Sequence, residues 1–263
     1  MHHSKYTYIK TLVDANVSPV LLVGPAGTGK STLIMQIAEE RGTGFASQSC
    51  TKQMSVSALL GFISINGQYI PTQFREAYEK GYTFLLDEID AADPNVLLAL
   101  NTIENGFVSF PDGIIKGHPD FRLCATANPF NDHAQYTGRS KLDFSTIDRF
   151  FVVELPRDNT LEISLTSESL HLEAETAREL MSSLGMSRTV TMRDCIRIHK
   201  LSQLDIVECA FKEVVFLDNP ETYLVFKQKQ QEAQTEQAKR SRTQADATSI
   251  DELWEIIQQE SQS

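Results

Sequence analysis

The sequence has no apolar run near the roughly 20 residues that a membrane-spanning helix needs, and its first ten residues lack the apolar core of a signal peptide. We therefore expect a soluble, cytoplasmic protein that enters no membrane. The four cysteines show no CxxC or Cys/His ligand spacing, which predicts reduced, structural thiols. An excess of positive charge is also absent, because the formal net charge is −11. That charge disfavours broad attraction to nucleic acid and makes a protein the better expected partner.

What is present is a chain of 263 residues, 41% of them apolar, which is enough for one large α/β domain and a smaller one. In the first part of the chain, short runs that are apolar throughout alternate with helical patterns. This pattern predicts a doubly wound α/β fold around a parallel sheet that is buried on both faces. The expected strands are Val20–Val23, Phe84–Leu86, Phe121–Ala125 and Phe151–Leu155, and the expected helices are Ser31–Arg41, Pro71–Lys80 and Pro94–Glu104.

The α/β pattern ends near Pro156, and a helical segment without strong strands follows it. Residues 1–158 are therefore expected to form an α/β core, and residues 159–227 a small C-terminal helical lid domain. Its clearest helical patterns are Leu172–Leu184 and Met192–Gln203.

Residues 228–263 form a Gln-rich tail with very few large apolar side chains, which predicts a flexible or loosely helical tether. The tail ends in Ile250–Gln259, where four apolar side chains, including the only tryptophan, fall on one helical face. Two interpretations stay open here. The short helix packs on the protein's own core, or it docks onto a partner.

The strongest signal is GPAGTGKS at Gly24–Ser31, between an expected strand and an expected helix, and it matches the phosphate-loop pattern at every fixed position. Small residues let the backbone turn its N–H groups toward phosphate oxygens, and the following helix adds its positive N-terminal end. Lys30 is expected to meet the β- and γ-phosphates of ATP, and the Ser31 hydroxyl to coordinate Mg²⁺. The residues expected to hold the nucleotide are Gly24, Pro25, Ala26, Gly27, Thr28, Gly29, Lys30, Ser31 and Thr32.

Two further apolar runs end in polar residues. In FLLDEID at Phe84–Asp90, Asp87 is placed to hold Mg²⁺ through water, and Glu88 to orient and polarise the attacking water. In LCATANP at Leu123–Pro129, Asn128 is placed to hydrogen-bond that water or the γ-phosphate. The alternative for Asn128 is a routine turn before proline.

Three arginines are candidates for contact with the phosphates. Arg149, in STIDRFF, is expected to reach a neighbouring protomer's γ-phosphate, where it would stabilise transition-state charge. The alternative is that it pairs with Asp148 or another surface acid. Arg139, in TGRSKLD, is a second candidate for the same role, and a structural role is equally open. Arg193, in TMRDCIRIHKL, opens an expected helix and is placed to reach its own protomer's nucleotide; otherwise it is a helix-surface arginine.

Taken in order, the phosphate loop, DEID, HPDFRLCATAN, YTGRSKLDFSTIDRF and TMRDCIRI resemble the MoxR-like AAA+ ATPases. The branch they resemble most holds the ATPase subunit of aerobic cobaltochelatase and the CbbQ and NorQ activators. The resemblance covers about residues 15–225. It implies hexamers and a partner that carries a von Willebrand factor A domain. It also implies the roles of phosphate-loop lysine for Lys30, magnesium ligand for Ser31, acidic pair for Asp87 and Glu88, first sensor for Asn128, arginine finger for Arg149 and second sensor for Arg193.

The family also implies insertions that handle a client, and Gly61–Pro71 and Phe107–Gly117 both have hairpin patterns. Ordinary hairpins packed on the domain are the alternative. The candidate client contacts are Phe62, Tyr69 and Phe110.

Together these signals predict a Mg²⁺-dependent ATP hydrolase that forms a homo-oligomeric ring, expected to be a hexamer, and remodels or activates a partner protein. A nucleic-acid-encircling motor or loader is the alternative. The acidic composition disfavours it, whereas the basic run at Lys239, Arg240 and Arg242 leaves it open. A scaffold that binds ATP without hydrolysis is disfavoured by the intact Glu88.

Overall fold

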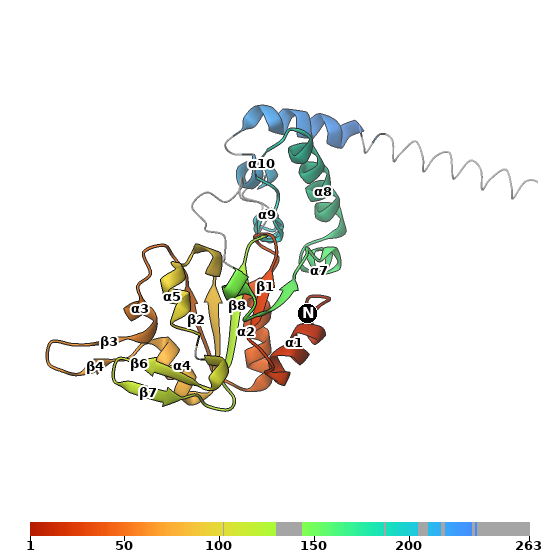
Figure 1. Cartoon of the computed structure of the whole chain (residues 1–263). Coiled ribbons are helices and arrows are strands. Elements are labelled where there is room, and N and C mark those ends of the chain that lie inside the picture. Colours follow the sequence, from red (N-terminus) through yellow and green to blue (C-terminus); the bar gives the residue numbers. More distant parts are fainter. Residues whose placement is uncertain are drawn as a thin grey trace, which may run out of the picture. The chain divides into compact units, whose positions relative to one another are not determined.

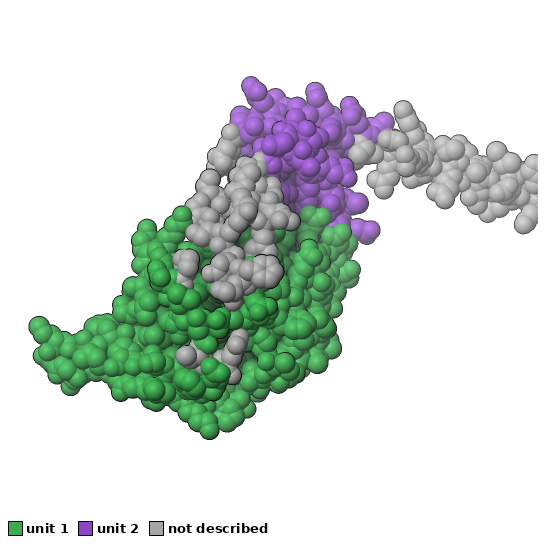
Figure 2. All heavy atoms as spheres, viewed as in Figure 1, with its two compact units in different colours: residues 1–165, 191–193 green, residues 166–190, 194–263 purple. Residues whose placement is uncertain are grey.

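The computed structural model of the protein describes residues 1–101, 103–129, 144–186, 188–204, 210–216, 219–232 and 235, and Figure 1 shows its elements in chain order. The chain divides into two compact units (Figure 2). The first unit consists of residues 1–165 and 191–193, and the second of residues 166–190 and 194–263. The first unit thus extends beyond residue 158, and it includes a short segment at the start of a later helix.

The first unit is built on a five-stranded sheet in which every neighbouring pair of strands is parallel. The strand order is β2-β5-β8-β1-β9. This arrangement confirms the predicted α/β fold, and it contains all four predicted strands. The strands are β1 (Val20–Val23), β2 (Phe45–Ser49), β5 (Thr83–Asp87), β8 (Arg122–Ala127) and β9 (Phe151–Glu154).

The sequence does not predict β2, whose residues are FASQS. This strand lies at the edge of the sheet and pairs with β5 alone, from Phe45 opposite Thr83 to Ser49 opposite Asp87. None of its residues is fully buried. An edge strand of this kind needs no continuous apolar run, so it lacks the pattern that reveals the central strands.

Helices cover both faces of the sheet (Figure 1). The helices of this unit are α1 (Tyr6–Ala15), α2 (Lys30–Arg41), α3 (Val56–Leu60), α4 (Gln73–Lys80), α5 (Pro94–Leu98), α6 (Phe144–Ile147) and α7 (Asn159–Leu165), with the 3₁₀ turns η1 (Ile89–Ala91) and η2 (Ile103–Asn105). Successive side chains of a strand point to opposite faces. Accordingly, Leu21 and Val23 of β1 belong to a core cluster with α4, whereas Val20 and Leu22 belong to a second cluster with α1 and α2.

The predicted helix Pro94–Glu104 is wrong beyond Leu98. Its start is as expected, because Asp93 caps it: the Asp93 side chain accepts a hydrogen bond of 2.8 Å from the Asn95 N–H. After Leu98 the backbone bonds follow a three-residue spacing, such as Asn101 N–H to Leu98 C=O at 3.1 Å. This spacing is that of a 3₁₀ turn rather than an α-helix.

Both predicted hairpins are present in the first unit. They are formed by β3 (Phe62–Ile63) with β4 (Tyr69–Ile70), and by β6 (Phe107–Phe110) with β7 (Gly113–Lys116). In the first hairpin Gly67 adopts a φ of 75°, and its N–H donates to the Ser64 carbonyl at 2.9 Å. A positive φ of this kind is typical of a tight hairpin turn.

The elements described in the second unit are helices: α8 (Glu168–Ser183), α9 (Met192–Ser202, whose first two residues belong to the first unit), α10 (Ala210–Val215) and helical residues 220–232. Residues 228–232 therefore continue a helix that begins before the Gln-rich tail. The core of the second unit includes the stacked rings of Phe211, Phe216 and Phe226. Within the described part of the chain, no helix combines the length and apolarity needed to cross a bilayer.

Candidate nucleotide site

The phosphate loop connects the end of β1 to the start of α2. Gly29 adopts a φ of 86°, a left-handed conformation that glycine reaches at little cost. Gly24 is needed for another reason, since a Cβ at that position would lie 2.1 Å from the carbonyl oxygen of Leu155, which follows β9. The Thr28 hydroxyl donates to the Pro25 carbonyl at 3.1 Å and closes the loop.

Lys30 and Ser31 lie in the first turn of α2, at the positive end of the helix. The ammonium of Lys30 donates to the carbonyls of Gly24 and Pro25 at 2.7 and 2.8 Å. The Ser31 hydroxyl points toward the sheet and donates to the carboxylate of Asp87 at 2.9 Å. The loop therefore places one cation and one hydroxyl beside the end of β5.

Asp87 is the last residue of β5, and Glu88 follows it at the edge of the sheet. The Asp87 carbonyl accepts a bond of 2.8 Å from the Cys50 N–H. Glu88 has a φ of 59°, which is uncommon for a residue other than glycine, and its side chain is exposed. The backbone thus turns sharply between the two acids.

These acids also affect a neighbouring thiol. Burial raises the pKa of Cys50 to about 12, and the negative charges of Asp87, Asp90 and Glu88 add to the effect. Cys50 is consequently a neutral thiol at physiological pH rather than a nucleophile. Like Cys124 and Cys195, it is buried and forms no disulfide among the described residues. Cys209 lies outside the described residues.

One pocket of about 140 Å³ collects most of the expected site residues. It is lined by Ala26, Gly27, Gly29, Lys30, Ser31, Thr32, Asp87, Glu88, Thr126, Ala127, Asn128 and Arg193. The lining has no aromatic or large aliphatic side chain, so it suits the phosphates of a nucleotide rather than its base. All of these residues belong to the first compact unit.

Asn128 follows β8 and is 6% exposed. It lines the pocket beside the acidic pair because β8 is the neighbour of β5 in the sheet. Arg193 has an exposed side chain and lines the same pocket, and its backbone N lies 3.6 Å from the position of a Cβ on Gly27. The structure therefore brings both residues to the phosphate loop.

Arg149 is not among the residues that line this pocket. It is half-buried after α6, where its Nη1 donates to the Asn101 carbonyl at 3.4 Å and its own carbonyl accepts a bond of 2.8 Å from the Ser18 hydroxyl. Among the described residues, no acid forms an ion pair with its guanidinium. Arg139, the other candidate, lies outside the described residues.

Thr126 is a site residue that the sequence does not single out. Its side chain is fully buried on β8, and its hydroxyl contacts both Asp87 and Glu88. The available signal was its position in LCATANP, two residues before Asn128 and therefore on the same face of the strand.

The donor set fits a magnesium ion. The hydroxyl of Ser31 and the carboxylate of Asp87 are hard oxygen ligands, and they lie within hydrogen-bond distance of each other. Mg²⁺ prefers one or two such protein ligands together with water and substrate phosphates. Ser31 and Asp87 are therefore the residues that would hold it.

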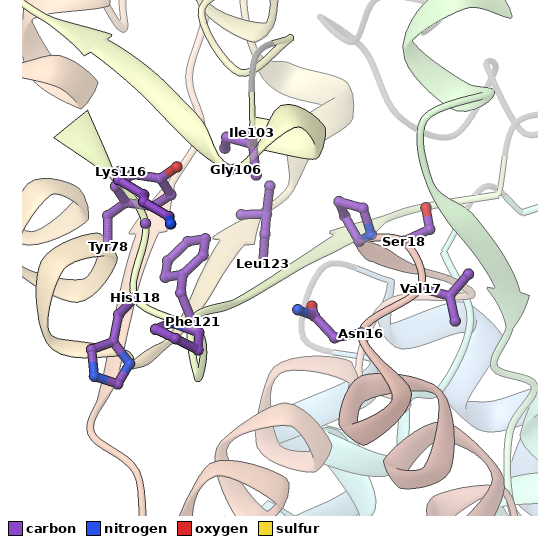
Figure 3. Close-up of a pocket in the computed structure, with 13 residues that line it drawn as sticks. Asn16, Val17, Ser18, Tyr78, Ile103, Gly106, Lys116, His118, Phe121 and Leu123 are labelled. Carbon is purple, nitrogen blue, oxygen red and sulfur yellow. The ribbon is translucent and has the colours of Figure 1, made fainter. Parts of the chain in front are cut away.

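A larger cavity of about 520 Å³ lies at the opposite end of the sheet. Figure 3 shows Tyr78, His118 and Phe121 on one side of it and Asn16, Val17 and Ser18 on the other. It is formed where β1 and β8 begin, whereas the phosphate loop and the acidic pair lie where the strands end. Size alone therefore does not identify the nucleotide site in this protein.

The fold and the pocket together define a P-loop ATPase domain. The model of the AAA domain family (dynein-related subfamily) matches residues 19–150, about half of the chain. The chain belongs to this family.

Several proteins are similar to this chain. Midasin from Dictyostelium discoideum is 30% identical in an alignment 171 residues long that covers 61% of this chain and 3% of that protein. Midasin from Giardia intestinalis is 27% identical in an alignment 199 residues long that covers 69% of this chain and 4% of that protein. For an uncharacterised protein of Staphylococcus aureus strain USA300, the identity is 28% in an alignment 161 residues long that covers 56% of this chain and 58% of that protein. The chain thus spans a small part of the midasins and less than two thirds of the staphylococcal protein.

Among solved structures, NtrX from Brucella abortus in complex with ADP aligns with a TM-score of 0.50 at 14% identity. The alignment covers 75% of this chain and 49% of that chain. At this level of identity the likeness concerns the fold alone.

Proposed function

We propose that this chain is a Mg²⁺-dependent ATP hydrolase that assembles into a homo-oligomeric ring, taken to be a hexamer, and remodels or activates a partner protein. The proposal is carried by one observation. A single pocket joins a phosphate-loop lysine, a metal-binding hydroxyl–carboxylate pair, an exposed glutamate and a buried asparagine.

In this proposal the phosphate loop and Lys30 bind the β- and γ-phosphates. The ammonium of Lys30 lies within 2.8 Å of two loop carbonyls, so it is already held at the phosphate-binding concavity. Backbone N–H groups at the start of α2 add further donors.

Ser31 and Asp87 would hold Mg²⁺, Asp87 in part through water, and the ion would offset the negative charge that develops on the phosphates. The Ser31 and Asp87 oxygens are 2.9 Å apart, so little side-chain movement is needed to present both.

Glu88 orients the attacking water and accepts its proton. Its exposed carboxylate lies at the mouth of the pocket, directly after the metal-binding Asp87. Asn128 donates a hydrogen bond to the same water or to the γ-phosphate, which fixes the line of attack. Arg193 contacts the phosphates of its own protomer.

Arg149 is proposed to act on the nucleotide of a neighbouring protomer. Its position outside the pocket of its own protomer supports this assignment, because every other charged residue proposed for the site lines that pocket. An arginine supplied in trans stabilises transition-state charge only when subunits assemble, which makes hydrolysis depend on the ring.

The hairpin β3–β4 is the proposed client contact. Phe62 is 50% exposed and Ile65 is fully exposed at its tip. Phe110, which the sequence also suggests as a client contact, is 4% exposed, and its ring lies 5.9 Å from that of Phe74. The assignment of Phe110 is therefore wrong, since its side chain is part of the core.

Arg75 of α4 connects the two hairpins. Its guanidinium lies 5.2 Å from the ring centre of Tyr69 on β4 and 4.4 Å from that of Phe110 on β6. Its Nη1 also donates to Asp112, in the turn between β6 and β7, at 2.8 Å. Cation–π contacts and a partly buried ion pair of this kind hold both hairpins to one helix. Force on the client hairpin is thereby passed to the second hairpin.

The partner is proposed to be a protein with a von Willebrand factor A domain, and the chain to belong to the branch of cobaltochelatase and CbbQ-type ATPases. Both proposals rest on the order of motifs in the sequence.

The test of this function is phosphate release measured over a wide range of protein concentrations with Mg²⁺ and ATP. We expect the rate per protomer to rise as the ring assembles, and Glu88→Gln to bind ATP with little turnover. A monomer, established by sedimentation velocity with ATP present, that hydrolyses at full rate would contradict the ring. Salt-dependent stimulation by oligonucleotides would instead favour a nucleic-acid motor.

A further inference from the structure

The hydroxyl of Thr126 connects the two acids of the nucleotide site. It donates a hydrogen bond to Oδ1 of Asp87 and accepts one of 2.9 Å from the backbone N–H of Glu88. The Thr126 side chain has no solvent exposure. A threonine hydroxyl has a single proton, so donation to Asp87 leaves its lone pairs for the amide of Glu88. Both capacities are used, and the orientation of the hydroxyl is determined by its two partners.

This connection begins where the backbone ladder between β5 and β8 ends. The last paired residues of the two strands are Leu86 and Ala125. Asp87 is paired with Ser49 of β2 on its other side, and no ladder bond joins it to β8. The side chain of Thr126 therefore connects β8 to β5 just beyond the last paired residues, where Asp87 and Glu88 follow the ladder.

The link also bears on the backbone of Glu88. A left-handed conformation is unfavourable for a residue other than glycine, and Glu88 adopts it with a φ of 59°. The Thr126 hydroxyl satisfies the Glu88 N–H, and the Glu88 carbonyl accepts a bond of 2.8 Å from the Ala91 N–H. Without the hydroxyl, the Glu88 amide would lose this hydrogen bond in a conformation that is already unfavourable.

We infer that Thr126 is a positioning residue for ATP hydrolysis, acting by holding Asp87 and Glu88 in the geometry that hydrolysis needs. This inference rests on the proposed hydrolysis of ATP at this pocket. Thr126 transfers no proton; its effect passes through Asp87, which binds the metal, and through Glu88, which orients the water. Loss of the hydroxyl should therefore reduce turnover more than nucleotide affinity, because the phosphate loop and Lys30 are unaffected.

The test compares Thr126→Val with Thr83→Val in the full chain. Thr83 has the same residue type and no exposure, and it lies on β5 at the far end of the strand, where its hydroxyl is 3.3 Å from that of Thr43. Both changes remove one buried hydroxyl from the same sheet, but Thr83→Val leaves the acids untouched. We expect Thr126→Val to lower kcat by on the order of 100-fold, the scale of a small misplacement of catalytic groups.

Thr126→Ser keeps the hydroxyl, and it should retain most of the activity. ATP affinity, measured by equilibrium binding, should remain near the parent value in each variant. If Thr126→Val does not fold, Thr126→Ala and Thr126→Ser form the replacement pair, since they differ only in the hydroxyl. Thermal unfolding of all variants separates loss of fold from loss of turnover.

The inference fails if the valine variant, or the alanine variant in its place, has a kcat close to that of Thr83→Val. It also fails if kcat and ATP affinity fall together by the same factor, or if serine does not restore turnover. A parent protein that shows no hydrolysis at any concentration would instead overturn the proposed function, so the two failures are distinguishable.

Discussion

The hydroxyl of Ser31 lies 2.9 Å from Oδ1 and 3.0 Å from Oδ2 of Asp87, although 56 positions separate the two residues in the sequence. One begins the helix after β1, and the other ends β5. Parallel strands bring their carboxyl ends to one edge of the sheet, which is where ligands bind in open α/β folds. The proposed metal-binding pair is thus assembled from two distant motifs.

Replacing Ser31 by alanine should raise the Mg²⁺ concentration needed for half-maximal hydrolysis by roughly 10-fold or more, as expected when a contact with a charged partner worth about 1.5–3 kcal/mol is lost. Ser31→Thr is the matched control, because the phosphate-loop pattern accepts either hydroxyl. Magnesium titration of phosphate release gives the comparison. If the alanine and threonine variants needed the same Mg²⁺ concentration for half-maximal hydrolysis, Ser31 would be excluded as a magnesium ligand.

Mixing two inactive variants tests the trans role of Arg149. Arg149→Ala keeps its own pocket intact, and Glu88→Gln keeps its arginine. In a mixed ring, a Glu88→Gln subunit can supply Arg149 to the intact pocket of an Arg149→Ala neighbour, so part of the ATPase activity should return on mixing. A mixture as inactive as its components would show that Arg149 does not act between protomers.

The phosphate loop offers a comparison of two glycines. In Gly24→Ala the new Cβ would lie 2.1 Å from a backbone oxygen, so either the loop or the end of β9 must move. In Gly29→Ala the Cβ meets open space, and the cost is the positive φ of 86°, roughly 1–2 kcal/mol. Urea unfolding should show a larger loss of stability for Gly24→Ala. The reverse order would contradict the close approach of Leu155.

Asp158 should give the first unit a pH-dependent contribution to stability. Burial raises its pKa, but hydrogen bonds from the N–H groups of Leu161 and Ser4, together with the nearby His3, outweigh that effect and hold the pKa below the ordinary value of 3.8. The unfolded chain therefore binds a proton at this carboxyl more readily than the folded one, and protonation favours unfolding. The contribution is present above the ordinary pKa and is lost as the pH falls through the lowered value.

Asp158→Ala should lower the free energy of unfolding by about 1 kcal/mol at neutral pH, as for other residues that cap a helix N-terminus. The difference from the parent should shrink as the pH falls below the ordinary pKa. Urea titrations at several acidic pH values provide the measurement. A difference that stays constant with pH would show that the ionised carboxylate contributes nothing.

Much of the first unit could be predicted because its central strands are buried on both faces. Continuous apolar runs identify β1, β5 and β8. The phosphate loop, the acidic pair and Asn128 are easily recognised at the ends of these runs. The grouping of the phosphate loop, the acidic pair and Asn128 in one pocket then follows from parallel pairing. The roles of these residues stay predictions until activity is measured.

Thr126 could not be recognised in this way. A β-branched residue inside an apolar strand is ordinary, since its side chain suits the pleated surface. The contacts of the Thr126 hydroxyl with Asp87 and Glu88 become visible only when the identity and register of the neighbouring strand, β5, are known. Strand order is a long-range property that no local pattern contains.

Local sequence patterns also could not predict which aromatic side chains of the hairpins are exposed to solvent. In β6 the side chains alternate between exposed and buried, and Phe110 falls on the buried face, against α4. Alternation reveals that one face is buried, but the packing partner decides which one. The end of α5 could not be predicted from local patterns either. There, Leu97 and Leu100 pack into the core where the backbone changes to 3₁₀ turns.

The strands that carry the nucleotide pocket, β5, β8 and β1, are consecutive neighbours in the middle of the sheet, while each hairpin lies in a connection between strands. Long connections tolerate redesign at low entropic cost, so a hairpin is a natural place for sequence exchange between related ATPases. Because the β3–β4 hairpin is the proposed client contact, transplanting this segment should change which client binds and leave the rate of ATP hydrolysis unchanged.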